Sequence, residues 1–480
     1  MSGAIFQVGE NKVRPGIYFR SKNAGQPVAS GIPKGICAAI FQADWGPLGQ
    51  VVTLENINQV STVYLDGGTT IVPIECFKGN AKTVKAFRLG NSGTGSKATK
   101  NLQDTTGSPI DAVKADAKYV GAVTDIKITI RDSLSDANKR ECLIYKGTAL
   151  KKTYTFDKGS SGIGEPAALV AAAAADPNQW VDFTKLADGN KILAALTQSA
   201  LSGGANPTVN GTSYSDALSA IESVDWNTLA IDTNDTATHA TVQTYIDRVV
   251  SEGKRVLGVI GEPTSVALAT RQADAKAFND VTMIYVLNGF IETDGTEIEG
   301  YKAAARVAGM IAASSYRDSL THAIVTGAVE IKGGLTNSEI ESSLQSGAIV
   351  FTKNANDQVQ IEYGINTLVT PSGDQDAGWK KIRRTRTRYE LMDRIASIWD
   401  PLIGKIDNSK DGQAILVGAA QGVVNQMIKE GGFLDGAQVK IDPDNQPSGD
   451  QAWFVFEGND VDSAEKLYLT FGFRFAPETT

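Results

Sequence analysis

The stretch "RVLGVIGEPTSVALATRQADAKAFNDVTMIYVLNGF", residues 255–290, decides the fold class. It opens with a short apolar run at 255–261, continues through a segment of helix-forming residues, and closes with a second apolar run at 281–290. Each run has the length of a strand and is apolar on both faces, which is typical of strands buried in a parallel sheet. A strand, a helix and a strand in succession indicate a parallel pair joined by a crossover helix.

The same alternation continues on both sides of this stretch. "WNTLAID" at 226–232 is a further short strand, and "TATHATVQTYIDRVVSEG" at 236–253 has the periodicity of an amphipathic helix. "GYKAAARVAGMIAASS" at 300–315 predicts a helix of small residues. We therefore expect a mostly parallel sheet that is covered by helices on both faces.

Regions further out are richer in strands. "VTDIKITIRD" at 123–132 alternates apolar and polar residues, and "AIVFTKNANDQVQIEYG" at 348–364 is typical of a hairpin with strands at 348–352 and 358–363. The sequence predicts an α/β and α+β multidomain chain with a central α/β domain, an inserted β-rich domain, a C-terminal α+β domain and extended arms at both ends. The expected ranges are 1–22 for the N-terminal arm, 23–97 with 164–334 for the central domain, 98–163 for the insertion, 335–463 for the C-terminal domain and 464–480 for the C-terminal strand or arm.

Both ends carry short strand-like patterns. "EKLYLTFGFRF" at 465–475 alternates strictly, and "NKVRPGIYFR" at 11–20 holds apolar residues around a Pro-Gly turn. An extended segment at a chain end suits the addition of a strand to an exposed sheet edge of another subunit. The residues expected to form these intersubunit strands are Val13, Ile17, Phe19, Leu467, Leu469, Phe471 and Phe473.

Motifs for catalysis or cofactor binding are weak. "GNSGTGSK" at 90–97 has Ser96 where a phosphate-binding loop needs its lysine, and "GVIGEP" lacks the later glycines of a dinucleotide fingerprint. His239 and His322 lack the spacing of paired metal ligands. Asp232 and Asp235 follow a strand and are expected to form turns and caps, although a carboxylate-dependent α/β enzyme remains an alternative. We expect no catalytic residue, no cofactor and no metal, and three buried thiols at Cys37, Cys76 and Cys142 rather than disulfides.

A cluster of positive charge stands out at residues 378–395, "GWKKIRRTRTRYELMDRI". The chain has a formal charge of −8, so without the six cations of this run it carries −14. Read as a helix, the run has a basic face and an opposite, buried apolar stripe that includes Met392, and Pro401 ends it. The stretch "DGQAILVGAAQGVVNQMIKEGGF" at 411–433 predicts a second amphipathic helix, with Ile415 on its apolar face. The cations either pair within the chain or face a negatively charged partner, and nucleic acid is the less favoured partner because no aromatic residues alternate with the arginines. The six residues are Lys380, Lys381, Arg383, Arg384, Arg386 and Arg388.

Bulk properties limit the location of the protein. The sequence pI near 5.1 argues against general nucleic-acid binding. No apolar run reaches the length of about 18–20 residues that spans a bilayer, so we expect no stable membrane insertion. The N-terminus lacks the pattern of a signal peptide, which predicts synthesis and folding in a cytoplasm.

Motifs along nearly the whole chain, from "NKVRPGIYFR" at 11–20 to "AEKLYLT" at 464–470, resemble those of the contractile tail sheath proteins of bacteriophages and phage-tail-like bacteriocins. The closest matches are "INTL" at 365–368, "IGKIDN" at 403–408 and "AEKLYLT" at 464–470, with "NKVRPGIYFR" matching the start and "AAARVAGMIAA" the middle domain of the family. The resemblance is weakest across 98–163.

This resemblance implies a mechanical role. Subunits of such sheaths form six-membered rings stacked around a tail tube, contract after a baseplate trigger, and drive the tube through a cell envelope. Their arms join a sheet in the C-terminal domain of neighbouring subunits, the C-terminal domain lies innermost, and the insertion lies outermost. The implied partners are the chain itself, a tube protein, and baseplate and tail-terminator proteins, in a virion tail or tail-like particle assembled in a host bacterial cytoplasm. In related sheaths a C-terminal-domain helix meets the tube through complementary charge, so the six cations are candidates for tube contact. A static tail-tube or surface-lattice protein is the alternative structural role.

Overall fold

The computed structural model describes residues 4–5, 18–19, 34–159, 164–186 and 192–474. The chain divides into two compact units. The larger comprises residues 33–389 and 462–480, and the smaller comprises residues 1–32 and 390–461. Each unit is described separately below.

The larger unit is organised around a seven-stranded sheet. All neighbouring strands are parallel except the edge pair β4–β5, which is antiparallel. The expectation of a mostly parallel sheet is therefore confirmed. The strands, in order across the sheet, are β19 (Ala348–Ile349), β15 (Met283–Val286), β14 (Leu257–Gly261), β13 (Thr228–Ile231), β3 (Ile36–Phe41), β5 (Thr83–Arg88) and β4 (Val51–Leu54).

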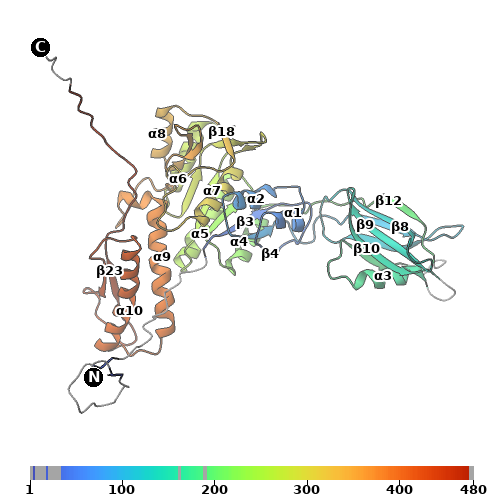
Figure 1. Cartoon of the computed structure of the whole chain (residues 1–480), viewed down its shortest axis with the longest axis horizontal. Helices are drawn as coiled ribbons and strands as arrows, with labels where there is room; N and C mark the ends of the chain where they lie inside the picture. The colour runs from blue at the N-terminus through green and yellow to red at the C-terminus, as the bar shows by residue number, and fades with distance from the viewer. Residues whose placement is uncertain (1–3, 6–17, 20–33, 160–163, 187–191, 475–480) are drawn as a thin grey trace. The chain divides into compact units, whose positions relative to one another are not determined.

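Helices cover both faces of this sheet, as Figure 1 shows for α2 and α7 on one side of β3 and for α4 and α5 on the other. Successive residues of β3 belong to different cores: Ala39 packs toward α2 and α7, and Ala38 packs toward α4 and α5. This explains why the strands are apolar throughout. One face carries α1 (Asn58–Tyr64), α2 (Ile71–Lys78) and α7 (Tyr301–Ala313), and the other carries α4 (Gly211–Glu222), α5 (Thr236–Ser251), α6 (Leu268–Phe278) and α8 (Asn337–Gln345).

Small residues allow α2 and α7 to approach closely. A side-chain carbon at Gly309 of α7 would lie 2.1 Å from the carbonyl oxygen of Cys76, so only glycine fits there. Cys37 and Cys76 are buried free thiols with their sulfur atoms 3.1 Å apart, and Cys142 is also buried and free. The expectation of three buried thiols is confirmed.

Residues between β5 and α4 form a β-rich insertion with its own core. A four-stranded sheet has the order β10-β9-β8-β12, and a three-stranded sheet has the order β11-β7-β6. These sheets include two strands that lie beyond the expected end of the insertion at residue 163. The elements are β6 (Thr99–Gln103), β7 (Asp111–Ala117), β8 (Ile126–Asp132), β9 (Lys139–Lys146), β10 (Ala149–Asp157), α3 (Glu165–Ala174), β11 (Val181–Lys185) and β12 (Leu196–Ala200).

The larger unit also extends past residue 335, where the sequence suggested a domain boundary. Strand β19 pairs in parallel with β15 of the central sheet, and the compact unit ends at residue 389. The expected strand 348–352 is divided, because residues 348–349 join the central sheet while the next strand forms a hairpin. The remaining elements are β16 (Gly289–Glu292), β17 (Glu297–Ile298) and β18 (Ala328–Lys332) in one small sheet, and β20 (Phe351–Lys353) with β21 (Val359–Ile361) in the hairpin.

The smaller unit is a helical hairpin with a two-stranded sheet. Trp399 packs against Phe454 with ring centroids 5.1 Å apart, and Phe433 packs against Phe456 at 5.0 Å, both pairs with tilted rings. Val423 and Met427 are fully buried beneath the sheet. The unit contains the second part of α9 (Ile382–Trp399), the 3-10 turn Asp400–Leu402, α10 (Lys410–Lys429), β22 (Gln438–Ile441), β23 (Phe454–Glu457), and the parallel pair β1 (Ala4–Ile5) and β2 (Tyr18–Phe19).

Two local predictions about the helices need correction. The basic run does not begin a helix at residue 380, because residues 377–380 form a 3-10 turn and Lys381 is extended. The carboxylate of Asp376 accepts a hydrogen bond from the backbone N–H of Gly378, which favours this separate turn. Met392 and Ile415, expected on buried stripes, are 46% and 56% exposed in the single chain.

Candidate assembly interface

The six cations of the basic run have partners within the larger unit. Lys380 donates to the carbonyl of Leu344 at 2.5 Å. Arg386 donates to the carbonyl oxygens of Ser314 and Ser315, and burial lowers the pKa of Arg386 to about 10. These bonds fix the start of α9 to the end of α7 and to α8.

The other four cations divide between two places. Arg384 lies 3.3 Å from a carboxylate oxygen of Asp376, and the guanidinium of Arg388 lies 3.8 Å from the ring centroid of Trp379. Lys381 and Arg383 both approach Asp462 at the start of the C-terminal segment, at 2.5 and 3.8 Å. The cations of the run therefore pair within the chain, which is one of the two interpretations that the sequence left open. Contact with a tube stays a prediction.

The C-terminal segment behaves differently from the rest of the larger unit. Residues 461–474 form no helix or strand. The alternating apolar side chains that the sequence singled out are Leu467, Leu469, Phe471 and Phe473, with exposed fractions of 84%, 76%, 70% and 89%. Four large apolar groups in water are costly, at roughly 1.5–3 kcal/mol each relative to burial. Such a segment is suited to a partner surface.

A sheet edge suited to such a segment lies in the smaller unit. Strands β22 and β23 are antiparallel, and Asp442 donates to Trp453, which sets the register of the ladder. In this register the backbone groups of Phe454 and Phe456 point away from β22. Within the described residues no hydrogen bond to the outer side of β23 is found. Among the residues that the structure describes, no strand covers the edge of β23, and such an edge can accept another strand.

The outer edge of β22 is partly occupied by a side chain. The carboxamide of Gln421 on α10 accepts from the backbone N–H of Val439 at 2.8 Å and donates to the carbonyl of Ala437 at 3.1 Å. These are the two bonds that one residue of an added strand would make. Gln421 thus favours β23 over β22 as the accepting edge.

The N-terminal candidates are only partly visible. Val13 and Ile17 lie outside the described residues. Phe19 lies in β2, which pairs in parallel with β1.

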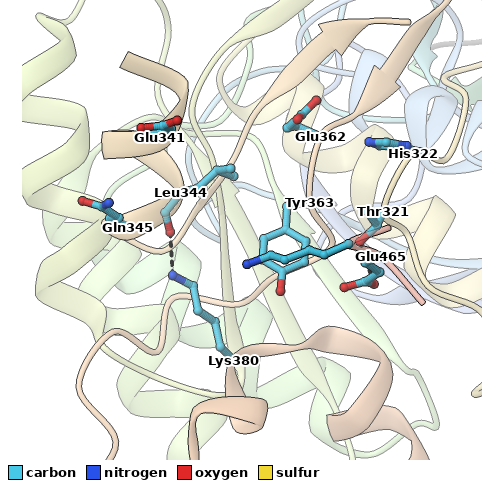
Figure 2. A pocket seen from close by; sticks show the side chains of 10 residues that line it. Thr321, His322, Glu341, Leu344, Gln345, Glu362, Tyr363, Lys380 and Glu465 are labelled. Atoms are coloured by element: carbon cyan, nitrogen blue, oxygen red, sulfur yellow. Dashed lines mark hydrogen bonds between the residues drawn. The ribbon is translucent and has the colours of Figure 1, made fainter. Parts of the chain in front are cut away.

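A recess of about 390 Å³ lies beside the root of the C-terminal segment, and Figure 2 shows Lys380 reaching the carbonyl of Leu344 within it. Glu362 accepts from Thr352, and Glu465 accepts from Ser319 and Thr321. These ionisable groups are already bonded within the chain, so the recess resembles an anchoring region more than an arranged catalytic site.

The carboxylates that carried the enzyme alternative have structural partners. Asp235 caps α5 by accepting from the backbone N–H of Thr238 at 2.8 Å, as predicted. Asp232 is instead a buried acceptor for Tyr214, Thr69 and Gln42, which ties α4 to the sheet. His239 is buried with Nε2 2.9 Å from the carbonyl of Thr233, and burial lowers its pKa. Across residues 34–159, 164–186 and 192–474 no group of three or more His, Cys, Asp or Glu residues is arranged to hold a metal ion. In the same ranges, no helix combines the length and apolarity needed to cross a membrane.

Comparison with known proteins identifies the family. Residues 208–367 match the family model "Phage tail sheath protein central domain", and residues 374–474 match "Phage tail sheath C-terminal domain". The chain belongs to the phage tail sheath family. As a family member it is a structural subunit of a contractile sheath, a component of a phage tail or tail-like particle.

Individual relatives agree with this assignment. The chain is 28% identical over 396 residues to the "Phage-like element PBSX protein XkdK" of Bacillus subtilis, covering 80% of this chain and 79% of the relative. The crystal structure of a sheath tail protein from Desulfitobacterium hafniense has the same fold, with a TM-score of 0.70 and 23% identity over 93% of this chain and 100% of that one. The contracted helical sheath of the anti-feeding prophage is similar at a TM-score of 0.53 and 10% identity, covering 96% and 99% of the two chains.

The sequence missed several residues of this sheath protein's interface region. Ser319, Thr321, Asp462 and Gln421 bond to segments far away in the chain, and such contacts leave no periodic pattern. The one available signal was the acidic "DSAE" at 462–465, directly before the apolar alternation and opposite in charge to the basic run.

Proposed function

We propose that this sheath subunit forms six-membered rings stacked around a tail tube, with the C-terminal arm of each copy completing the β22–β23 sheet of a neighbour. Contraction of the connected rings, started at the baseplate, then drives the tube through a cell envelope. The observation that carries the proposal is that one chain has both an exposed alternating segment, residues 467–473, and a strand edge on β23 that no described strand covers.

Energetics favour a second copy as the partner of the arm. Ordering ten residues costs on the order of 10–20 kcal/mol in chain entropy. Burying the four alternating side chains returns roughly 1.5–3 kcal/mol each, which does not suffice alone. Ladder hydrogen bonds and packing against a sheet edge supply the remainder. Arm order therefore depends on assembly.

The work of the subunit is mechanical and makes or breaks no covalent bond. In the proposed particle the smaller unit lies toward the tube, the insertion lies outermost, and tail-terminator and baseplate proteins close the two ends. Assembly takes place in the cytoplasm of the bacterial host. Arg384 and Arg388 are the tube-contact candidates of the basic run that we retain, because Asp376 and Trp379, which they contact, lie in the turn before α9.

Mixed assembly with two tagged chains tests the proposal. One chain carries Thr470→Cys on the polar face of the arm, and the other carries Val455→Cys on the face of β23 that points away from the core. The native cysteines are buried and give little background. After co-expression with the neighbouring tube and baseplate proteins, electron microscopy should show sheathed tubes, and oxidation should join the two tags. Tubes without cross-links between tags would refute the arm exchange, and compact particles under all conditions would refute the sheath assembly.

A further inference from the structure

A set of polar contacts surrounds the root of the C-terminal arm. One carboxylate oxygen of Glu465 accepts from the hydroxyls of Ser319 at 2.7 Å, Thr321 at 2.9 Å and Ser463 at 2.9 Å. The other lies 2.6 Å from the ammonium of Lys381. Lys381 also binds Asp462 at 2.5 Å. The side chain of Glu465 is only 9% exposed.

Order ends abruptly after this cluster. Glu465 has four partners, whereas Leu467, two residues later, is 84% exposed and Tyr468 is 92% exposed. Thr321 is itself held, because its hydroxyl accepts from the backbone N–H of Gly364 at 3.1 Å. The arm is thus attached at one defined point to a rigid part of the larger unit.

We propose that Lys381, Ser319, Thr321, Asp462 and Glu465 form an arm clamp, a positioning device that sets the register in which the arm pairs with a neighbouring subunit. The inference rests on the proposed arm exchange. It assigns Lys381 of the basic run to anchoring the arm rather than to contact with the tube.

Register matters in this arm because its two faces differ. One face consists of Leu467, Leu469, Phe471 and Phe473, and the other of Tyr468, Thr470, Gly472 and Arg474. A slip of one residue would exchange these faces and direct the polar set toward the core of the neighbour. An arm fixed at Glu465 has only one residue of free chain before Leu467, so the clamp leaves little slack for such a slip.

Electrostatics support an ionised clamp at neutral pH. Burial alone would raise the pKa of Glu465, but the hydrogen bonds from Lys381, Ser319, Thr321 and Ser463 outweigh it and lower that pKa. Burial opposes the charge of Lys381 as well, yet its carboxylate partners raise its pKa. Both groups therefore stay charged, and each holds the other in place.

Register is measured by cross-linking in assembled sheaths of full-length chains. The arm carries Thr470→Cys on its polar face, and neighbouring chains carry either Val455→Cys or Glu457→Cys, two positions on the face of β23 that points away from the core. With an intact clamp one of the two cross-links should dominate. In Glu465→Ala and Lys381→Ala the ratio should fall by at least about tenfold, the factor expected when a hydrogen bond to a charged group is lost.

Matched variants separate positioning from general damage. Lys381→Arg keeps a charged donor and should retain the parental ratio, as should Lys466→Ala, which alters an exposed neighbour outside the clamp. If a charge-removing variant does not fold, the pair Ser319→Ala with Thr321→Val removes two donors without leaving a buried charge unpaired. An unchanged ratio in the folded clamp variants overturns the clamp. Absence of both cross-links in the parent instead overturns the arm exchange itself.

Discussion

Strand β14 and the C-terminal arm are made of the same kind of residue and have opposite environments. The apolar residues of β14, Leu257, Val259 and Ile260, are 1–2% exposed between two neighbouring strands and two layers of helices. The apolar residues of the arm are 70–89% exposed and have no neighbouring strand in the described part of the chain. Where the chain supplies both neighbouring strands, the apolar side chains stabilise the subunit. Where it supplies none, the same chemistry is available for joining subunits.

Removal of residues 467–480 should have the largest effect, because it deletes the segment that is proposed to join subunits. We expect sheathed tubes to disappear in electron micrographs, while the free energy of unfolding of the unassembled chain changes by less than about 0.5 kcal/mol, since exposed groups contribute little to the fold. The matched control is Leu134→Asp, which alters a side chain 83% exposed in the insertion and should leave assembly intact. Normal tubes from the truncated chain would remove the arm from the mechanism.

The opposite change acts on the core and spares the arm. Arg306 is 1% exposed, and one of its nitrogens lies 2.7 Å from Glu75 and 2.5 Å from Glu292. Arg306→Leu should lower the free energy of unfolding by about 3–5 kcal/mol, because two buried carboxylates lose their partner. Denaturant unfolding measures the change, with Lys302→Leu on the same helix as the control. A loss below about 1 kcal/mol would mean that Lys78 alone compensates both carboxylates, given the typical cost of breaking a buried pair.

The core was the part that sequence could predict. The strands at 228–231, 257–261 and 283–286 are continuous apolar runs between helical periods, so local pattern and burial agree. The "TNSE" at 336–339, in which Thr336 and Glu339 form the capping box of α8, is an equally local signal. These signals need no information about distant residues.

Pairings between distant segments could not be predicted. Strand β19 has two residues and no period, and only its pairing with β15 makes it part of the central sheet. Strands β11 and β12 join the insertion from residues well beyond its expected end. The basic run showed its charge but not its partners, because Leu344, Ser314 and Asp462 are far from it in sequence.

Acid should release the arm while the core remains folded. Hydrogen bonds to the ionised form lower the pKa of Glu465, so its contribution is present above the unfolded value of about 4.3 and is lost as the pH falls through the lower folded value. A fluorophore on Leu469→Cys should therefore lose anisotropy only below about pH 4. Glu465→Gln should give low anisotropy at every pH, without a transition. If the anisotropy of the labelled chain with Glu465 intact falls at the same pH as global unfolding, the arm is not released separately.

The smallest effect on the fold is expected from Arg384→Glu combined with Arg388→Glu. These side chains contact the exposed carboxylate of Asp376, the ring of Trp379 and the hydroxyl of Thr385. The ion pair and the cation–π contact each contribute at most about 1 kcal/mol. The unfolding free energy should therefore change little. If the two arginines also face the tube, assembly on purified tubes should fall sharply and depend on salt, because the reversed charges then meet the complementary surface. Lys100→Glu with Lys127→Glu in the insertion changes the net charge equally and serves as the control. Normal assembly by the charge-reversed chain would mean that the basic run has intrachain roles alone. The arm would then be the part of the C-terminal region that binds another molecule, and the basic run would not.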